Sequence, residues 1–482
     1  MVRRKPGVPV GRIVFLSLAG FALLFCALAA FAYIRFTFFL KAVAPNADIR
    51  QILGIVEQPH TAEAAQHLGR VNFLLLGYGG AGHDGAYLTD SMMVVSAQTD
   101  THQLAMISIP RDLWISIPTN RYGLYWTTKI NGAYTIGVDD STFPYKDARF
   151  SGPLGGGNLS SEMVHRVTGL PIQYWIAVDF DGFRKVVDSV GGVDLNVPQV
   201  LDDPYYPAGE TTGYMHIHFN AGWQHMNGEQ ALEYARSRET TSDFDRSRRQ
   251  QQILLAVRRK VLTIDGIPKL FGLMGALQAH VRTNMDLATL RRFADTVSRL
   301  EDTHAARVSI DNTNFLYTAH SEDGQYILLP YDVAFAGLKH YLDQVFADPE
   351  VPVEGAAVQF VNGTDNYGLA SRTMADLLTQ LWSWAGVKTI APADAARRAY
   401  VQSEVHDYSN GTAPDTVAFL AAFFNARVIT EAGPSPSGAG VVVIVGSTFA
   451  RSFIPYLPPP PPPAETPTPG PTASATPRPI GP

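Results

Sequence analysis

Residues 71–77 form an apolar run, interrupted only by Asn72, that ends in glycine, and this run constrains the fold more than any other feature of the chain. A short apolar run without polar alternation is typical of a strand buried on both faces. Further strands are expected, by apolar content and flanking turn residues, at residues 91–97, 104–109, 172–178 and 193–197. The segment 180–190 has the periodicity of an amphipathic helix. This alternation predicts an α/β domain over residues 71–345.

A smaller α/β unit is predicted at residues 354–450. Its strand and helix signals follow the order β-α-β-β-α-β, which is typical of a ferredoxin-like sandwich. Residues 451–482 begin with a proline run and continue rich in proline, threonine and alanine. Such a composition cannot bury a core, so a disordered polyproline II spacer is expected there.

An uncharged apolar segment, residues 13–34, precedes the predicted domains. At ~1.5 Å rise per residue a helix of this length spans the hydrocarbon core of a bilayer. Four basic residues come before it: Arg3, Arg4, Lys5 and Arg12. The positive-inside rule therefore predicts a single-pass membrane protein, with residues 1–12 cytoplasmic and everything from the connector at 35–70 onward outside. The alternative is a signal peptide cleaved near Ala29, but the apolar run continues past that point.

The charge and cysteine content exclude several classes of protein. The formal net charge is −6, so the basic footprint of a nucleic-acid-binding protein is missing. Cys26 is the single cysteine, which excludes an intrachain disulfide and a cysteine-based zinc site. The signatures of common serine hydrolases and zinc proteases, G-x-S-x-G and H-E-x-x-H, are also absent.

A group of arginines is concentrated in a short stretch of this mildly acidic chain. Its members are Arg236, Arg238, Arg246, Arg248 and Arg249. Residues 232–238 read as a strand that would point Arg236 and Arg238 to one side. A helix is predicted from Asp245, with Arg246, Arg249 and Gln250 on one face. Guanidinium groups suit bidentate capture of phosphate, although a solvated basic surface is the alternative.

Further candidate residues follow the predicted strands. Asp90 stands at the mouth of a strand, where a carboxylate can hold Mg²⁺ against phosphate oxygens or simply turn the chain. Arg111 and Asp112 follow a strand that stops at proline, where α/β sheets tend to place ligands; a structural ion pair is the alternative. Lys129 and Asn131 add a cation and an amide two residues apart.

Two other patterns are weak by themselves. The glycine-rich loop at residues 77–85 follows a buried strand but lacks the lysine and hydroxyl of a P-loop. His216 and His218 alternate on one strand face. We interpret them mainly as part of an edge strand; a metal site is the alternative, but no third ligand is suggested nearby.

These motifs, taken in order, are similar to those of a known family. They are Thr89-Asp90-Ser-Met-Met, Ser108-Ile-Pro-Arg111-Asp112, Lys129-Ile-Asn131-Gly-Ala-Tyr, Gly191-Gly-Val-Asp-Leu, Asn227-Gly-Glu-Gln-Ala-Leu-Glu-Tyr-Ala-Arg236-Ser-Arg238 and Asp243-x-x-Arg246-x-x-Arg249-Gln250-Gln251. Over residues 70–265 the chain resembles the LytR-CpsA-Psr family of cell-envelope proteins. Residues 356–449 resemble the LytR C-terminal domain, on the evidence of Val358-x-Phe-Val-Asn-Gly-Thr and a closing apolar strand.

The resemblance implies a central mixed sheet flanked by helices and a transferase activity. Such proteins move a glycan phosphate from a polyprenyl diphosphate carrier to peptidoglycan, outside the membrane. Asp90 would hold Mg²⁺, or Mn²⁺, and would be catalytic together with Arg111, Asp112, Arg236 and Arg238. The diphosphate would be bound by Arg111, Lys129, Asn131, Arg236, Arg238, Asp243, Arg246, Arg249 and Gln250. Either Asp90 or Asp112 can accept the acceptor's proton.

The chain departs from the family pattern in two places. Gly79 stands where the family usually has an aspartate, and Leu88 and Thr89 stand where it commonly has arginine. Our hypothesis is that Asp84, in the longer glycine loop, replaces the missing metal ligand. Two other activities stay open: hydrolysis of the polyprenyl diphosphate or its glycan conjugate, and binding of lipid-linked glycan or wall polymer without catalysis.

Overall fold

The computed structural model describes residues 70–83, 85–98, 103–207, 213–237, 243–261, 277–286, 289, 305–345, 354–381 and 387–453. The predicted membrane segment, the connector up to residue 69 and most of the proline-rich tail lie outside these ranges, as do Asp84 and Arg238. Within the described ranges, no helix combines the length and the apolar character needed to cross a membrane.

The first part of the chain alternates strands and helices. Its strands are β1 (Arg70–Tyr78), β2 (Thr89–Gln98), β3 (Leu104–Ser108), β4 (Trp114–Pro118), β5 (Tyr125–Lys129), β6 (Tyr174–Asp179), β7 (Val193–Val197), β8 (Leu201–Pro207), β9 (Tyr214–Phe219), β10 (Gly222–Met226), β11 (Val281–Thr283), β12 (Ala305–Ser309), β13 (Leu316–His320) and β14 (Tyr326–Pro330). Its helices are α4 (Gly132–Val138), η1 (Ala148–Phe150), η2 (Gly152–Leu154), α5 (Gly155–Thr168), α6 (Phe180–Ser189), α7 (Gly228–Arg236), α8 (Asp243–Val261) and α12 (Ala336–Asp343). The strands predicted at 71–77, 91–97, 104–109, 172–178 and 193–197 and the helix at 180–190 are confirmed.

A six-stranded mixed sheet forms the centre, in the order β11-β6-β1-β2-β3-β12. Strand β2 is antiparallel to both β1 and β3. Strand β6 is parallel to β1, and β12 is parallel to β3. The predicted α/β fold with a central mixed sheet is therefore confirmed.

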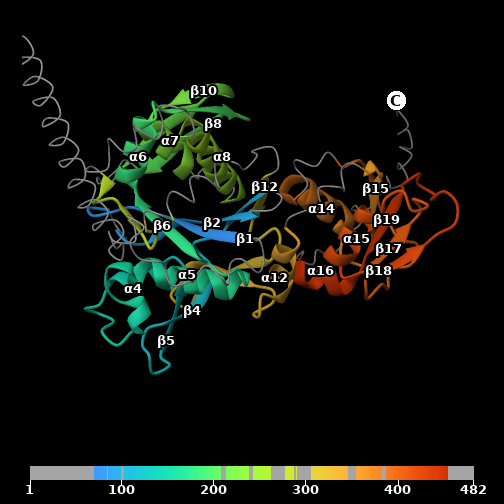
Figure 1. The fold of residues 1–482 in the computed structure, drawn as a ribbon, viewed down its shortest axis with the longest axis horizontal. Helices are drawn as coiled ribbons and strands as arrows, with labels where there is room; N and C mark the ends of the chain where they lie inside the picture. Colours follow the sequence, from blue (N-terminus) through green and yellow to red (C-terminus); the bar gives the residue numbers. More distant parts are fainter. Residues whose placement is uncertain are drawn as a thin grey trace, which may run out of the picture.

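Helices cover both faces of this sheet because the central strands are apolar on both sides. On one face, Leu74 and Leu76 of β1 belong to a core that includes Leu159 of α5. On the other face, Phe73 packs in a second core with Leu255 of α8. Figure 1 shows α4 and α5 on one side of the sheet, and α6, α7 and α8 on the other. Burial on both sides explains why residues 71–77 lack polar alternation.

The strand predicted at residues 232–238 is wrong, because this segment belongs to helix α7. The apolar residues alternate at Leu232 and Tyr234, which imitates a strand. A capping box starts this helix at Asn227: the Asn227 side chain accepts a hydrogen bond from the Gln230 backbone, and the Gln230 side chain accepts one from the Asn227 backbone. Arg236 is consequently the last residue of a helix. The alternation of a strand therefore does not place Arg236 and Arg238 on one side.

The C-terminal unit is a five-stranded mixed sheet with helices. Its elements are β15 (Val358–Asn362), α14 (Leu369–Asp376), η4 (Leu377–Leu381), β16 (Thr389–Asp394), β17 (Glu404–Asp407), α15 (Pro414–Phe423), β18 (Arg427–Thr430), β19 (Val441–Val445) and α16 (Ser447–Phe453). The strand order is β16-β15-β19-β17-β18, and only β17 and β19 are antiparallel neighbours. The predicted ferredoxin-like order is not confirmed: β18 is an additional strand, and most neighbours run parallel.

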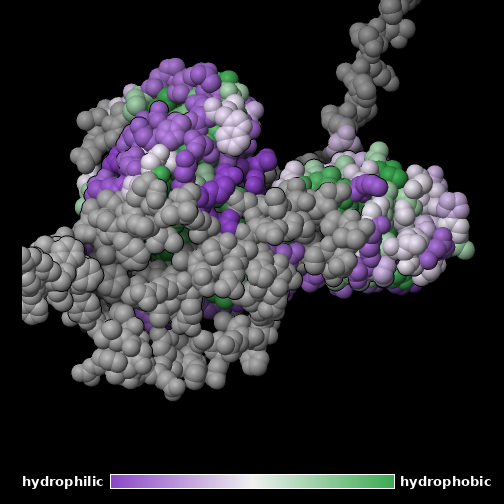
Figure 2. Space-filling model, turned by 45° about the horizontal axis from the view of Figure 1, so that its top comes forward, coloured by the Kyte–Doolittle hydropathy of each residue, from purple (hydrophilic) through white to green (hydrophobic). Residues whose placement is uncertain are grey.

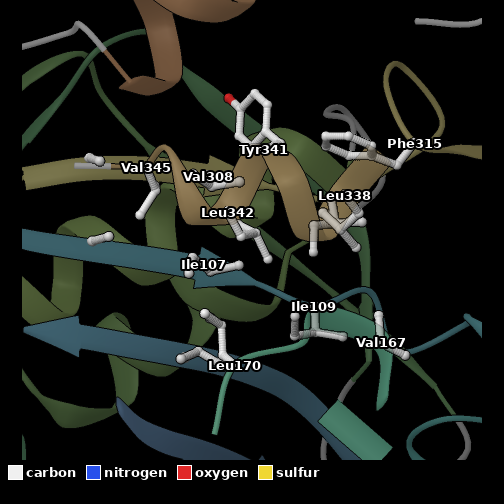
Figure 3. Close-up of a cluster of buried hydrophobic side chains, with 14 of the residues drawn as sticks. Ile107, Ile109, Val167, Leu170, Val308, Phe315, Leu338, Tyr341, Leu342 and Val345 are labelled. Carbon is white, nitrogen blue, oxygen red and sulfur yellow. The ribbon is translucent and has the colours of Figure 1, made fainter. Parts of the chain in front are cut away.

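The two parts of the chain share a hydrophobic core. Helix α12 packs over the strands β3 and β12, and Figure 3 shows Ile107 and Val308 from these strands beside Leu338 and Leu342 of α12. Tyr341 of the same helix packs edge-on against Phe423 of α15, with ring centroids 5.4 Å apart. Because one side chain contacts both parts, we expect them to unfold together.

A buried carboxyl group lies at this contact and should make stability depend on pH. Tyr341 donates a hydrogen bond to Asp376 at 3.0 Å, and Gln380 donates another. Burial raises the pKa of Asp376 to about 7, helped by the nearby charge of Asp311. Since the folded pKa lies above the unfolded value, the contribution of Asp376 to stability is fully present below about pH 4 and is lost as pH rises through 7.

The variant Asp376→Asn, which cannot ionise, should therefore be more stable than the wild type at pH 8. Urea unfolding at pH 5 and pH 8 measures the difference, and the gain should shrink at the lower pH. An equal effect of the substitution at both values would contradict the assignment. Asp365→Asn, which changes an exposed aspartate of the same unit, serves as the control.

Close packing of α5 against β6 gives a second prediction. A Cβ at Gly157 would lie 2.2 Å from Cδ2 of Trp175, whose side chain is fully buried. Gly157→Ala should therefore lower the free energy of unfolding by about 1–3 kcal/mol, because the indole has no space to retreat into. The matched control is Gly213→Ala, where an added Cβ would meet nothing within 4 Å. Urea unfolding of both variants checks the prediction, which fails if they are equally stable.

Candidate active site

The candidate site lies at one edge of the central sheet. The strands β1, β6, β3 and β12 all end at this edge, because β6 is parallel to β1, β12 is parallel to β3, and the antiparallel β2 begins there. Asp90 is the second residue of β2, Arg111 follows β3, and Asp311 follows β12. The carboxyl ends of neighbouring strands are where open α/β sheets bind ligands.

Asp90, Arg111, Asp112 and Lys129 form one chain of alternating charges. Arg111 forms an ion pair with Oδ1 of Asp90 and places its Nε 3.4 Å from Oδ2 of Asp112. Lys129 Nζ lies 2.7 Å from Oδ1 of Asp112. The Asp112 side chain is only 7% exposed, whereas that of Asp90 is 42% exposed. Asp112 thus holds the two cations from the protein interior, whereas Asp90 is exposed to solvent.

Asn131 connects these residues through its backbone. Its carbonyl oxygen accepts hydrogen bonds from the backbone N and the Oγ1 of Thr89, at 3.4 and 3.3 Å. Its own N–H donates to the carbonyl oxygen of Arg111 at 3.4 Å. The side chain is buried. The contacts of Asn131 therefore fix the backbone at Thr89, next to Asp90, and at Arg111.

Helix α8 brings Arg246 and Gln250 into the same pocket as Asp90. This pocket is lined by residues of β2, β3, α8, β14 and the segments that follow β3 and β12: Asp90, Ser91, Met92, Ser108, Ile109, Pro110, Arg246, Ser247, Gln250, Ile310, Asp311, Asn312, Tyr326 and Leu328. Ser91 donates to Oε1 of Gln250 at 3.0 Å, and Nε2 of Gln250 donates to the carbonyl oxygen of Ala235 at 3.4 Å. Gln250 thereby joins β2, α8 and α7 at the wall of the pocket.

Arg249 has a different position from Arg246. Its guanidinium is buried and donates to the carbonyl oxygens of Tyr234, at 2.8 Å, and Ser237. Burial lowers the pKa of Arg249 from its usual value, and the nearby Tyr234 opposes this shift. A cation near the last carbonyls of a helix stabilises the helix end. Arg249 therefore holds the C-terminus of α7 and the start of the segment that carries Arg238.

Arg236 lies between two aromatic rings. Its guanidinium carbon is 4.3 Å from the ring centroid of Phe180 and 5.4 Å from that of Tyr206, and its Nη1 donates to the Tyr206 hydroxyl at 3.1 Å. Phe180 directly follows the end of β6, so Arg236 also lies at the edge of the sheet where Asp90 is found. Arg238 lies outside the described residues, and Asp243 is the first residue of α8 with a side chain that is not described.

Sequence reasoning missed Asp311, Asn312 and Tyr326, which line the pocket. The signal for Asp311 and Asn312 was present: the apolar residues of β12 are followed by Asp-Asn, in the same way that those of β3 are followed by Pro-Arg-Asp. Tyr326 gave no signal, because its strand lies beside the site through a non-local contact, the isolated bridge between Leu113 and Leu328.

The described residues fit a magnesium ion held by one protein carboxylate. Oδ1 of Asp90 pairs with Arg111, and within the described parts of the chain Oδ2 has no hydrogen-bond partner. Mg²⁺ commonly binds one or two carboxylates and completes its octahedron with phosphate oxygens and water. At Gly79, a Cβ would lie 2.9 Å from Cβ of His83, so the loop itself fills the place of the missing aspartate side chain.

Comparisons with known proteins agree with the motifs. The model of the LytR-CpsA-Psr family matches residues 38–336. The chain is 33% identical over 199 residues to the polyisoprenyl-teichoic acid–peptidoglycan teichoic acid transferase TagV of Bacillus subtilis, a match that covers 41% of this chain and 45% of TagV. It is 32% identical over 223 residues to TagU of Oceanobacillus iheyensis, a transferase of the same description, over 46% of this chain and 61% of TagU. The chain thus spans about half to three fifths of these relatives.

Among solved structures, the crystal structure of B. subtilis TagV is similar with a TM-score of 0.43 and 26% identity, over 57% of this chain and 96% of that one. The match to the family model extends over more than half of the chain and includes every strand of the central sheet. The chain belongs to the LytR-CpsA-Psr family.

Proposed function

We propose that this protein transfers a glycan phosphate from a polyprenyl diphosphate carrier to peptidoglycan. The observation that carries the proposal is the pocket in which Asp90, paired with Arg111, faces Arg246 of α8. A carboxylate with an open oxygen beside guanidinium groups suits a ligand that carries both phosphate and a divalent cation. The relatives TagV and TagU, whose names describe transfer of polyisoprenyl-linked teichoic acid to peptidoglycan, support the choice of substrate class.

In the proposed reaction, a hydroxyl oxygen of the acceptor attacks the phosphorus that carries the glycan. A bond forms between that oxygen and phosphorus, the bond to the bridging oxygen of the diphosphate breaks, and polyprenyl phosphate leaves. The hydroxyl proton passes to a carboxylate or to water. Such a transfer needs positioning and charge stabilisation more than covalent help. A bound Mg²⁺, held by Asp90, would neutralise charge on the diphosphate.

The protein's own residues supply the rest. Arg111 and Arg246 bind phosphate oxygens and stabilise the charge that gathers on the leaving group. Asp112 keeps the Arg111 guanidinium in place through one carboxylate oxygen, and Lys129 pairs with the other. Asp112 is a poor proton acceptor, because both oxygens of its buried carboxylate already contact cations.

We also propose that residues 13–34 anchor the chain in the membrane with the site outside. A lipid-linked substrate has its diphosphate at the membrane surface, so an anchored enzyme meets it without leaving that surface. This placement is supported by the uncharged segment and the basic residues before it.

The direct test incubates the full-length protein in detergent with a labelled polyprenyl-diphosphate glycan, Mg²⁺ and peptidoglycan oligomers. Mass spectrometry should find the label joined to the oligomer through a phosphodiester. Release of free glycan phosphate in the presence of the oligomers would instead assign hydrolysis. Binding of the lipid without any product, with several acceptors tried, would reject both reactions. The hypothesis on Asp84 is tested in the same assay with Asp84→Asn, which should raise the Mg²⁺ concentration needed for turnover.

A further inference from the structure

The hairpin of β8 and β9 carries two imidazoles and a carboxylate on its outer face. Asp202 of β8 pairs directly with His218 of β9 in the ladder, and His216 lies two residues along the same strand. The side chains alternate, so that Ile217 and Phe219 face the core while His216 and His218 face solvent. Figure 2 shows that the described surface around α7, β8 and β10 is mostly hydrophilic. Asp202 is therefore the third potential ligand beside the two histidines, which the sequence did not suggest.

The donor atoms of these residues converge. Oδ1 of Asp202 lies 2.7 Å from Nε2 of His216 and 2.8 Å from Nδ1 of His218, and the three ligand atoms all lie within 4.8 Å of one another. Ligands of a tetrahedral zinc ion, at bond lengths of about 2.0–2.1 Å, are roughly 3.3 Å apart. Exposed side chains can make the small adjustment between these spacings by rotation, since no core packing holds them.

A second contact orients one of the rings as a metal ligand requires. Nε2 of His218 lies 3.2 Å from Oδ1 of Asn220. When Nε2–H donates to this amide oxygen, the lone pair of a neutral imidazole is on Nδ1, which is the atom that faces Asp202. Histidines that bind metals commonly donate their other ring N–H to an oxygen in this way. His225 of β10 offers a contrast: it pairs with Asp194 at 2.8 Å, and the second partner of that carboxylate is Lys260, a cation.

We propose that Asp202, His216 and His218 form a binding site for a zinc-class divalent ion. Two imidazoles and one carboxylate are a ligand set for zinc and related transition metals, whereas Mg²⁺ prefers oxygen ligands alone. Three protein ligands leave a further position for water. The site is separate from the Asp90 pocket and does not depend on the proposed transfer reaction.

The ion would link the two strands of a hairpin that contacts Arg236 and Ser237 at the end of α7. Asp203, next to Asp202, accepts a hydrogen bond from Ser237 at 2.7 Å, and Tyr206 contacts Arg236. Metal binding across β8 and β9 therefore restrains the strands that position the end of α7. We infer a structural role for the ion, with local stabilisation of the hairpin as its measurable effect.

The test uses the full-length protein without a histidine tag, stripped of metal by dialysis. Titration with Zn²⁺, followed by equilibrium dialysis and elemental analysis, should give one tightly bound ion per chain. Co²⁺ in its place should give the visible absorption of a tetrahedral or five-coordinate site. His216→Ala and His218→Ala should each weaken binding by more than about tenfold. His225→Ala, which removes an exposed histidine paired with a carboxylate, should leave binding unchanged.

Hydrogen exchange provides a readout that does not depend on the variants. Addition of Zn²⁺ to the wild type should slow exchange of the amides of β8 and β9 and leave those of β4 and β5 unaffected. If the wild type binds no zinc, or if the His218→Ala variant binds it as tightly as the wild type, the site does not exist. Binding with no change in the exchange of β8 and β9 would overturn the structural role.

Discussion

The Asp90→Ala variant is expected to lose transfer activity by about a hundred- to a thousandfold while it keeps its fold. The carboxylate is partly exposed at the start of β2, so its removal opens no cavity in the core. What is lost is the oxygen that would hold the cation against the diphosphate. The partner of Arg111 is lost too, but Asp112 still holds that guanidinium.

Transfer of labelled glycan at several Mg²⁺ concentrations checks this prediction. The residual activity of Asp90→Ala should no longer respond to Mg²⁺, whereas the wild type should lose activity when a chelator removes the ion. Asp181→Ala is the matched control, because Asp181 is also an exposed aspartate paired with an arginine, Arg184, but lies outside the pocket. Wild-type turnover by Asp90→Ala would refute the assignment of the site.

Arg246→Ala should reduce turnover by a similar factor of about a hundred or more, because Arg246 lines the pocket of Asp90. Arg248→Ala should change turnover no more than about threefold: Arg248 is exposed, two residues further along α8, and does not line that pocket. Both substitutions remove one positive charge from the same helix, so long-range electrostatics cannot explain a difference between them.

Arg246→Lys separates charge from geometry. A lysine keeps the charge but lacks the planar fork that binds two phosphate oxygens, so it should restore only a small part of the lost activity. The comparison is made on kcat/KM with the same labelled substrate, and urea unfolding confirms that each variant is folded. If Arg246→Ala and Arg248→Ala had the same activity, the phosphate-binding role of Arg246 would be wrong.

How much of this arrangement can be read from the sequence depends on the distance over which a signal acts. The apolar run of β1 and the strand-ending Pro-Arg-Asp at residues 110–112 are local signals, and both are found where they were predicted. The strand predicted at residues 232–238 failed because the alternation of Leu232 and Tyr234 was weighed above the capping box at Asn227.

The missing part of the pocket is non-local. Asp311 reaches the site because β12 pairs with β3, about two hundred residues earlier in the chain, and periodicity alone does not reveal such a pairing. The same holds for Asp202, which completes the proposed zinc ligands only when β8 pairs with β9. In the C-terminal unit, the order of strand signals does not specify which strands run parallel, and the ferredoxin-like prediction was not confirmed for this reason.

The buried side chain of Gln251 joins α8 to the central sheet, so its loss should inactivate the protein from outside the pocket. Its side-chain amide donates to Oγ of Ser108 at 3.1 Å and, at 3.4 Å, to the carbonyl oxygens of Met106 and Val308, so it fastens α8 to two strands of the sheet. With 1% of its surface exposed, it can touch no ligand. A random-mutagenesis screen for inactive alleles should nevertheless recover substitutions at this codon among those of the pocket, because a loosened helix would displace Arg246 from the pocket of Asp90.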